Sequence, residues 1–116
     1  MTGKSTMAYR KGEVILVPFP FTDLSTTKVR PALVLTTEAY EQATGSIIVA
    51  MITSVAHSTA FDYRLSDWKA AKLLYPSWVR TKLATLDPSL VRHTIGRLSD
   101  SDMQEVEVRM KSAFEL

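Results

Sequence analysis

The amino-acid sequence predicts a mainly β protein with some α structure: a small barrel or curled sheet, covered by one amphipathic helix at the C-terminus. Several short apolar segments follow one another between residues 13 and 98, with turn-forming residues between them. From residue 99 onward, apolar side chains recur at helical spacing instead. A chain of 116 residues, 46% hydrophobic and 22% charged, has the size and composition of one globular domain.

The first half of the chain contains three expected strands. Residues 13–17 (EVILV) form an apolar run that enters a constrained loop, because prolines follow that have no N–H to donate to a ladder. After this loop, residues 31–36 (PALVLT) restore a run rich in leucine and β-branched side chains. Residues 37–45 end in glycine and predict a turn or one short helix. Residues 46–53 (SIIVAMIT) are the most hydrophobic segment and predict the central strand.

The second half is expected to add further strands before the helix. Residues 61–65 (FDYRL) alternate as an edge or half-buried strand does. Residues 67–74 could form a helical turn, which Pro76 would stop. Residues 78–86 (WVRTKLATL) predict a strand whose charged members share one face, and residues 93–98 (HTIGRL) predict a shorter strand.

The expected C-terminal helix has both a start signal and an apolar stripe. A Ser-Asp-Ser-Asp sequence from residue 99 supplies cap residues and negative charge where the N–H groups of a helix lack partners. The residues that follow at helical spacing, and that we expect to pack on the sheet, are Met103, Val106, Met110, Ala113 and Phe114.

Residues 1–10 are polar, and we expect a flexible tail there, ahead of a single domain at residues 11–116. No apolar signal-peptide core follows a basic start, and no apolar stretch approaches the ~20 residues of a membrane span. We therefore expect a cytoplasmic location and no membrane contact. The chain has no cysteine and two histidines, so disulfides, thiolate nucleophiles and the usual zinc sites lose their support, and we expect neither a metal nor a cofactor.

Charge is unevenly distributed along the chain. Residues 1–37 carry five Lys or Arg side chains against two acidic ones, and residues 76–98 carry four against one. A fold that joins these blocks would present a positive face to a phosphate-bearing partner, although a solvated surface explains the same counts. Motifs for nucleotide hydrolysis, dinucleotide binding, zinc proteolysis and a serine nucleophile elbow are missing from the sequence. The remaining arginines, threonines, serines and aromatics suit phosphate chemistry without a metal.

Two cations stand directly before an expected buried strand, in KVRPALVLT (residues 28–36). Lys28 and Arg30 either end a loop and point into solvent, or the strand holds the arginine in a fixed position. A guanidinium held in this way could bind a phosphate with two parallel hydrogen bonds.

Three segments of the sequence together resemble one protein family. They are GEVILVPFPFTDLSTTKVRPALVLT, VAMITS and PSWVRTKLATLDPSLVRHTIGRLSDSDM, and the resemblance covers residues 11–115. The chain is similar to the PemK/MazF toxins of type II toxin–antitoxin systems, the metal-independent messenger-RNA endoribonucleases (mRNA interferases). The resemblance implies a small SH3-like β-barrel of the CcdB/MazF type, a homodimer, and a cognate antitoxin whose tail occupies the RNA groove.

The resemblance also implies a mechanism and the residues that carry it. Arg30 and Thr53 fall on the catalytic arginine and threonine of the family, which act on single-stranded messenger RNA in a sequence-selective way. The ribose 2′-hydroxyl attacks the adjacent phosphorus and leaves a 2′,3′-cyclic phosphate. We expect the RNA-binding side chains around this pair to be Lys28, Ser54, His57, Arg80, Lys82 and Phe21. Ser54 is also a possible helper of Thr53, and His57 a possible acid or base.

Each assignment has an alternative. Arg30 and Lys28 could be solvated surface cations, and Thr53 an ordinary β-branched strand residue. Phe19 and Phe21 could anchor the loop instead of stacking on bases. Trp68 and Trp78 are interpreted mainly as core or dimer contacts.

The sequence also departs from the family pattern. Where some members carry an acidic residue on the penultimate strand, the stretch of residues 79–82 has none, and the next carboxylate is Asp87. The usual glycine of the first long loop is also missing between Pro18 and Val29. Two other functions therefore remain open: a non-catalytic module that binds nucleic acid or an antitoxin, and a gyrase poison like CcdB.

Overall fold

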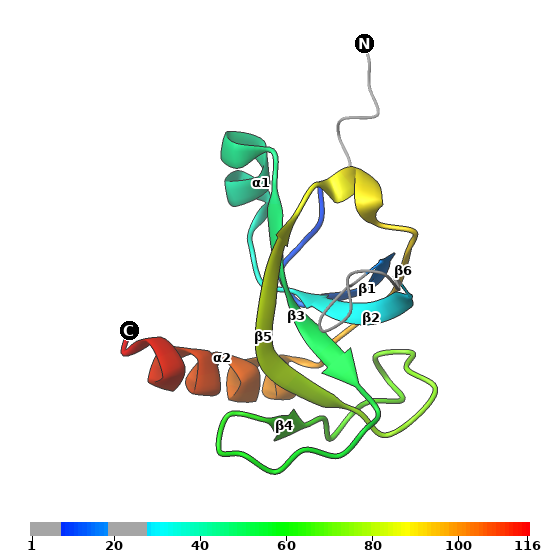
Figure 1. The fold of residues 1–116 in the computed structure, drawn as a ribbon, viewed down its shortest axis with the longest axis vertical. Helices are drawn as coiled ribbons and strands as arrows, with labels where there is room; N and C mark the ends of the chain where they lie inside the picture. Colours follow the sequence, from blue (N-terminus) through cyan, green and yellow to red (C-terminus); the bar gives the residue numbers. More distant parts are fainter. Residues whose placement is uncertain (1–7, 19–27) are drawn as a thin grey trace.

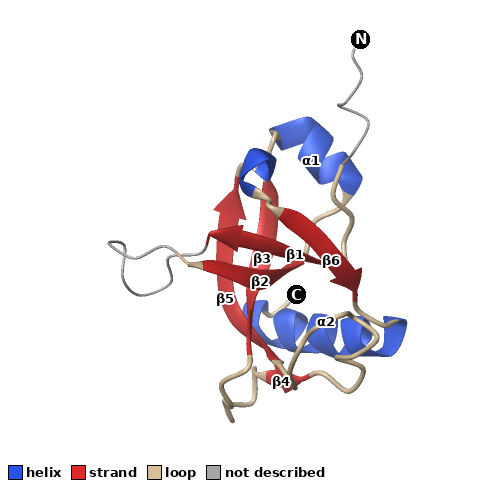
Figure 2. Cartoon of the chain, turned by 90° about the vertical axis from the view of Figure 1, so that its right-hand side faces the viewer, coloured by secondary structure: helices blue, strands red, loops and turns tan. Residues whose placement is uncertain are grey.

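A computed structural model describes residues 8–18 and 28–116. Its centre is a curled six-stranded antiparallel sheet with strand order β4-β5-β3-β2-β1-β6, as Figures 1 and 2 show. The strands are β1 Glu13–Pro18, β2 Val29–Val34, β3 Ile47–Thr53, β4 Tyr63–Arg64, β5 Trp78–Leu86 and β6 His93–Arg97. The helices are α1 Glu38–Thr44, a 3₁₀ turn at Pro88–Leu90, and α2 Asp100–Phe114.

Local sequence signals account for the helix ends. The Thr37 hydroxyl accepts a hydrogen bond from the N–H of Tyr40 at the start of α1, and Gly45 ends this helix in the left-handed conformation. Ser99 caps α2 in the same way, accepting a bond from the N–H of Asp102. The short helix expected at residues 37–45 is therefore confirmed.

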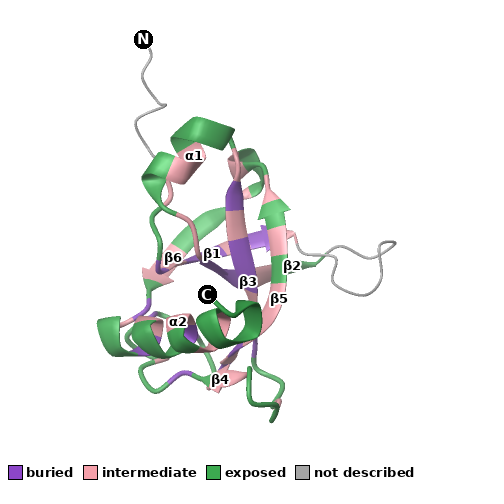
Figure 3. Ribbon diagram, turned by 90° about the vertical axis from the view of Figure 1, so that its left-hand side faces the viewer, coloured by how far each residue is buried: buried purple, intermediate pink, exposed green. Residues whose placement is uncertain are grey.

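The sheet buries apolar side chains on both faces because successive residues of a strand point to opposite sides. On one side, the helix face, Val14, Leu33, Ala50, Ile52 and Val79 pack in one cluster with Val106 of α2. On the other side, the far face, the buried residues are Ile15, Val17, Ala32, Val34, Ile47 and Val49. Figure 3 shows this buried centre running through β1, β2 and β3.

Helix α2 only partly follows the predicted apolar stripe. Val106 is buried, and Met103 and Met110 pack against the helix-face cluster. Ala113 and Phe114 are exposed, so the prediction was wrong for these two residues, because the C-terminal end of α2 extends away from the strands (Figure 1). Asp102 is instead fully buried near the N-terminus of the helix.

The segment between β3 and β5 differs from the strand that we expected at residues 61–65. Only Tyr63 and Arg64 pair with β5, at the edge of the sheet. The chain turns just before them, because the N–H of Asp62 bonds the carbonyl of Thr59 at 3.1 Å. The expected helical turn follows, closed by a bond from the N–H of Ala71 to the carbonyl of Asp67, and it ends at Lys72, before Pro76 is reached.

The last residues of the expected N-terminal tail contact the domain. The N–H of Tyr9 donates to the carboxylate of Glu41 at 2.8 Å, and the Tyr9 side chain packs against the far-face cluster. Residues 1–7 lie outside the described part of the chain. None of the described helices is long and apolar enough to span a membrane.

Candidate functional site

Arg30 and Thr53 lie at the adjoining ends of two neighbouring strands. β2 pairs with β3 from Val34–Val49 through Leu33–Ala50 to Ala32–Met51. The pairing ends at Ala32–Met51, and Arg30 and Thr53 each lie two residues beyond this last pair, at the adjoining ends of the two strands. Arg30 is also held from its other side, because it pairs with Val17 of β1.

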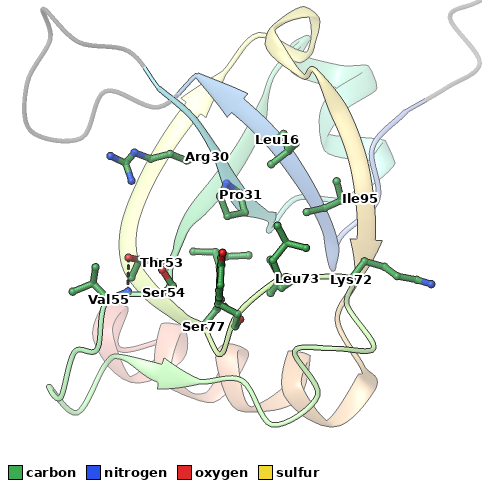
Figure 4. Close-up of a pocket in the computed structure, with 13 residues that line it drawn as sticks. Leu16, Arg30, Pro31, Thr53, Ser54, Val55, Lys72, Leu73, Ser77 and Ile95 are labelled. Atoms are coloured by element: carbon green, nitrogen blue, oxygen red, sulfur yellow. Dashed lines mark hydrogen bonds between the residues drawn. The ribbon is translucent and has the colours of Figure 1, made fainter.

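Both residues border a pocket of about 450 Å³ between the ends of β2 and β3 and the segment of residues 72–77. Apolar side chains form most of its wall, contributed by Leu16, Pro31, Ile52, Leu73 and Ile95. Figure 4 shows Arg30, Thr53 and Ser54 together on one side of this pocket. The structure therefore brings the two expected catalytic residues to one rim.

The hydroxyl of Thr53 has a defined position. The Thr53 side chain is buried, and its Oγ1 accepts a hydrogen bond from the N–H of Val55 at 3.1 Å. A hydroxyl that accepts one bond still carries a hydrogen that it can donate. Arg30 supplies a planar, permanently charged group with five N–H donors beside it. This combination can bind a phosphate that carries negative charge.

Arg80 makes an ion pair that the sequence did not reveal. Its Nε lies 2.9 Å from a carboxylate oxygen of Asp62, whose side chain is only 3% exposed. Burial raises the pKa of this carboxyl, but hydrogen bonds from Thr59 and Arg80 outweigh burial, so the pKa of Asp62 lies below its ordinary value. Asp62 is therefore an ionised partner of Arg80 at neutral pH, and Arg80 has a structural contact besides its predicted binding to RNA.

The other residues predicted to bind RNA have different surroundings. Lys82 lies in β5. The pairing register between β3 and β5 shifts here, so that residues 80–82 of β5 lie opposite the single residue Met51 of β3. Lys28 is exposed just before β2, Ser54 lines the pocket, and His57 is half-buried in the loop after β3. Phe19 and Phe21 lie outside the described residues. Trp78 is half-buried in β5 beneath the guanidinium of Arg64, at 5.7 Å, and Trp68 packs against the helix-face cluster.

Several pocket residues were not singled out from the sequence. They include Lys72, Leu73, Tyr75 and Ile95, which come from a turn and from β6. The pattern of apolar and charged residues around them is typical of any turn or edge strand, so the sequence contained no local signal for this pocket. Within residues 8–18 and 28–116, no group of three or more His, Cys, Asp or Glu side chains could hold a metal ion.

The fold and the arginine–threonine pair define a small β protein with a cationic site at the end of its sheet. The model of one protein family, described as "PemK-like, MazF-like toxin of type II toxin-antitoxin system", matches residues 10–114. The chain therefore belongs to this family of type II toxin–antitoxin toxins. A comparison with curated proteins finds no match.

Solved structures share the fold. An endoribonuclease in complex with its cognate antitoxin, from a mycobacterial species, has a TM-score of 0.78 at 16% identity, covering 94% of this chain and 97% of that one. MazF from Deinococcus radiodurans has a TM-score of 0.76 at 24% identity, covering 95% and 99%. The Mycobacterium tuberculosis toxin MazF-mt6 has a TM-score of 0.74 at 23% identity, covering 90% and 97%. The predicted fold class is confirmed.

Proposed function

We propose that this toxin is an endoribonuclease that cleaves single-stranded messenger RNA without a metal ion. The observation that carries the proposal is that Arg30 and Thr53 both border one pocket, in a chain of this family. A toxin that acts on messenger RNA works in the cytoplasm. The structural neighbours include endoribonucleases from mycobacterial species.

The chemistry uses a nucleophile that the RNA itself contains. The oxygen of the ribose 2′-hydroxyl loses its proton and bonds to the adjacent phosphorus, while the bond from phosphorus to the 5′-oxygen breaks. The products are a 2′,3′-cyclic phosphate and a 5′-hydroxyl end, which takes up a proton. Negative charge grows on the non-bridging oxygens in the transition state, where a fixed guanidinium stabilises it. We assign this role to Arg30, and we assign a hydrogen bond to the scissile phosphate to Thr53.

We also propose a cognate antitoxin and a homodimer as the partners of this chain. The structural neighbours include an endoribonuclease in complex with its cognate antitoxin and MazE-MazF from Deinococcus radiodurans. An antitoxin that covers the Arg30–Thr53 rim would block RNA directly. The positive blocks of the sequence give an acidic segment of such a partner a cationic surface to bind.

Purified protein incubated with single-stranded RNA in excess EDTA tests the activity. We expect cleavage in the chelator, and we expect none when 2′-deoxy residues replace the ribonucleotides, because the nucleophile is then absent. Arg30→Ala should lower the rate by roughly 10²–10³-fold. Thr53→Val keeps the β-branched shape and should lower it by roughly 10- to 100-fold, because a hydrogen bond to a charged group is lost.

Arg10→Ala is the matched control for the arginine substitution. Arg10 pairs with Glu38 of α1. Helix α1 leads into the start of β3, and Thr53 lies at the end of β3, so Arg10 does not belong to the pocket. We expect unchanged cleavage by this variant. Cleavage that requires added metal, or equal cutting of deoxy-substituted substrate, would show that the mechanism is wrong. Binding without cutting would favour the non-catalytic module.

A further inference from the structure

The pocket beside Arg30 has a second cation at its opposite side. Figure 4 shows Arg30 on one side and Lys72 on the other, with Leu16, Pro31 and Leu73 between them. Both charged ends extend outward in this view, so the two cations flank the apolar pocket. This arrangement is complementary to a nucleotide, whose aromatic base is apolar and whose ribose carries a phosphate on each side. The pocket volume of about 450 Å³ falls within the range of ordinary ligand sites.

Lys72 has a backbone conformation that is unfavourable for lysine. Its φ is +68°, in the left-handed region where residues with a Cβ are uncommon. The N–H of Leu73 bonds the carbonyl of Trp68, and the N–H of Lys72 bonds that of Lys69. This is the Schellman pattern that ends a helical turn, and its left-handed position is usually glycine. A lysine at this position is strained where glycine would not be.

The turn that carries Lys72 is pressed against β6. A Cβ added at Gly96 would lie 2.1 Å from the carbonyl oxygen of Ala71 and 3.0 Å from Cγ of Lys72. The backbone of the turn and the stem of Lys72 therefore rest directly on the strand, in a space that only glycine leaves open. This contact positions the stem of Lys72 on β6 at the edge of the pocket, while the residue stays exposed to solvent.

Tyr75 supplies an aromatic ring at the same pocket. Its side chain lines the pocket, and the residue is 64% exposed, so the ring is accessible to a ligand. Ser77 is buried and donates a hydrogen bond from its Oγ to the carbonyl of Tyr75 at 2.8 Å, which fixes the backbone next to the ring. An exposed ring on a fixed backbone is the arrangement on which unpaired bases stack.

We propose that this pocket is a base-binding subsite for a nucleotide next to the scissile phosphate. Tyr75 stacks on the base, and Lys72 binds a flanking phosphate. This inference rests on the proposed function, because it extends the RNA from Arg30 along the pocket. The segment of residues 72–77 is then a determinant of the bases that the toxin selects.

The binding test uses a fluorescein-labelled RNA oligonucleotide of mixed sequence, made non-cleavable by 2′-O-methyl groups, with fluorescence anisotropy as the readout. Lys72→Gln keeps the Cβ and the backbone strain but removes the charge. It should weaken binding about 3- to 10-fold and lower the slope of log affinity against log salt by about 0.7, the value for one phosphate contact on a single strand. Lys69→Gln is the matched control, because Lys69 lies in the same turn, with its ammonium over the Trp68 ring, and does not line the pocket.

Tyr75→Ala should weaken binding about 5- to 100-fold, while Tyr75→Phe, which keeps the ring, should bind like the wild type. Lys72→Gly relieves the strained φ and should be at least as stable as the wild type in urea, yet bind as weakly as Lys72→Gln. Sequencing of cleavage products should show relaxed base preference at one position beside the cut in Tyr75→Ala.

The results separate this inference from the proposed function. If the wild type cuts no RNA but Lys72→Gln and Tyr75→Ala still weaken binding, the subsite stands and the endoribonuclease proposal fails. If cleavage depends on Arg30 but these variants keep wild-type affinity and base preference, the subsite proposal is wrong. The variants could instead change the oligomeric state, measured by sedimentation, and leave RNA affinity unchanged. This result would identify the pocket as an interface between copies of the chain and would also overturn the subsite proposal.

Discussion

At the scale of single residues, the Asp62–Arg80 pair shows how burial and hydrogen bonding act against each other on one carboxylate. Burial disfavours the charged form of Asp62, but bonds from the hydroxyl and N–H of Thr59 and from Arg80 favour it more strongly. The pKa of Asp62 is therefore lowered by folding. Because Asp62 neutralises Arg80, the guanidinium at this position attracts a phosphate less than a free arginine would.

This lowered pKa predicts a dependence of stability on pH. Folding favours the ionised form of Asp62, so its contribution is complete above the ordinary value of 3.8 and is lost as pH falls through the lower pKa of the folded state. Asp62→Asn should lower the free energy of unfolding by about 1–3 kcal/mol at pH 7, because Arg80 loses a charged partner. The difference from the wild type should shrink below pH 4, as measured by urea unfolding.

Asp67→Asn is the control for this pH series, since the side chain of Asp67 is exposed. Its stability should follow that of the wild type at both pH values. A deficit in Asp62→Asn that is the same at pH 7 and pH 3 would contradict the interpretation, because the loss would then come from packing instead of charge.

At the scale of elements, α2 is attached to the sheet by one buried carboxylate as well as by its apolar side chains. Asp102 accepts hydrogen bonds from the hydroxyl of Tyr63 at 2.6 Å and from the N–H groups of Ser66 and Asp67 at 3.1 and 2.8 Å. The guanidinium of Arg109 lies over the ring of Tyr63, at 4.6 Å from its centroid. The first turn of α2 thereby fixes the segment that leads to Lys72 and the pocket.

Removal of this carboxylate should cost more stability than removal of one of its donors. Asp102→Ala leaves two backbone N–H groups and a phenol without their partner, and we expect a loss of about 3 kcal/mol in the free energy of unfolding. Tyr63→Phe removes a single bond and should cost about 1–2 kcal/mol. Asp100→Ala, an exposed substitution in the same helical turn, should change stability by less than about 1 kcal/mol. Equal stability of Asp102→Ala and Asp100→Ala would contradict this role.

At the scale of the whole molecule, the sheet joins segments that are far apart in the sequence. β1 lies between β2 and β6, so the first and last strands are neighbours. β3 and β2 occupy the centre, and β4 and β6 form the two edges. Arg30 and Thr53 therefore extend from the two central strands, which hold the backbone of both residues in position.

Amide hydrogen exchange should reflect this order. The N–H groups of Val49, Ala50 and Leu33 should exchange slowest, near the rate set by global unfolding, because both faces and both edges of their strands are covered. Residues of β4 and β6 should exchange faster, since each has one unpaired edge. Equal protection of β4 and β3, measured by mass spectrometry or NMR, would contradict this prediction.

The local elements were predictable because their signals lie within a few residues of each other. The expected strand at residues 78–86 has the same bounds as β5, and Gly45 and Ser99 end and start their helices as predicted. The predicted apolar stripe of α2 continued too far, to Phe114. Helical spacing indicates which face of a helix is apolar, but it does not show where the elements packed against that face end.

The sequence by itself determined the mainly β class, the terminal helix and, through the family resemblance, the assignment of Arg30 and Thr53. Only the tertiary structure decided which side chains of distant segments contact one another. The pairing of Asp62 with Arg80, the burial of Asp102 and the left-handed Lys72 resting on Gly96 depend on strand register and on contacts between distant segments. No local pattern encodes such contacts, because register and close packing are set by the summed fit of the whole sheet.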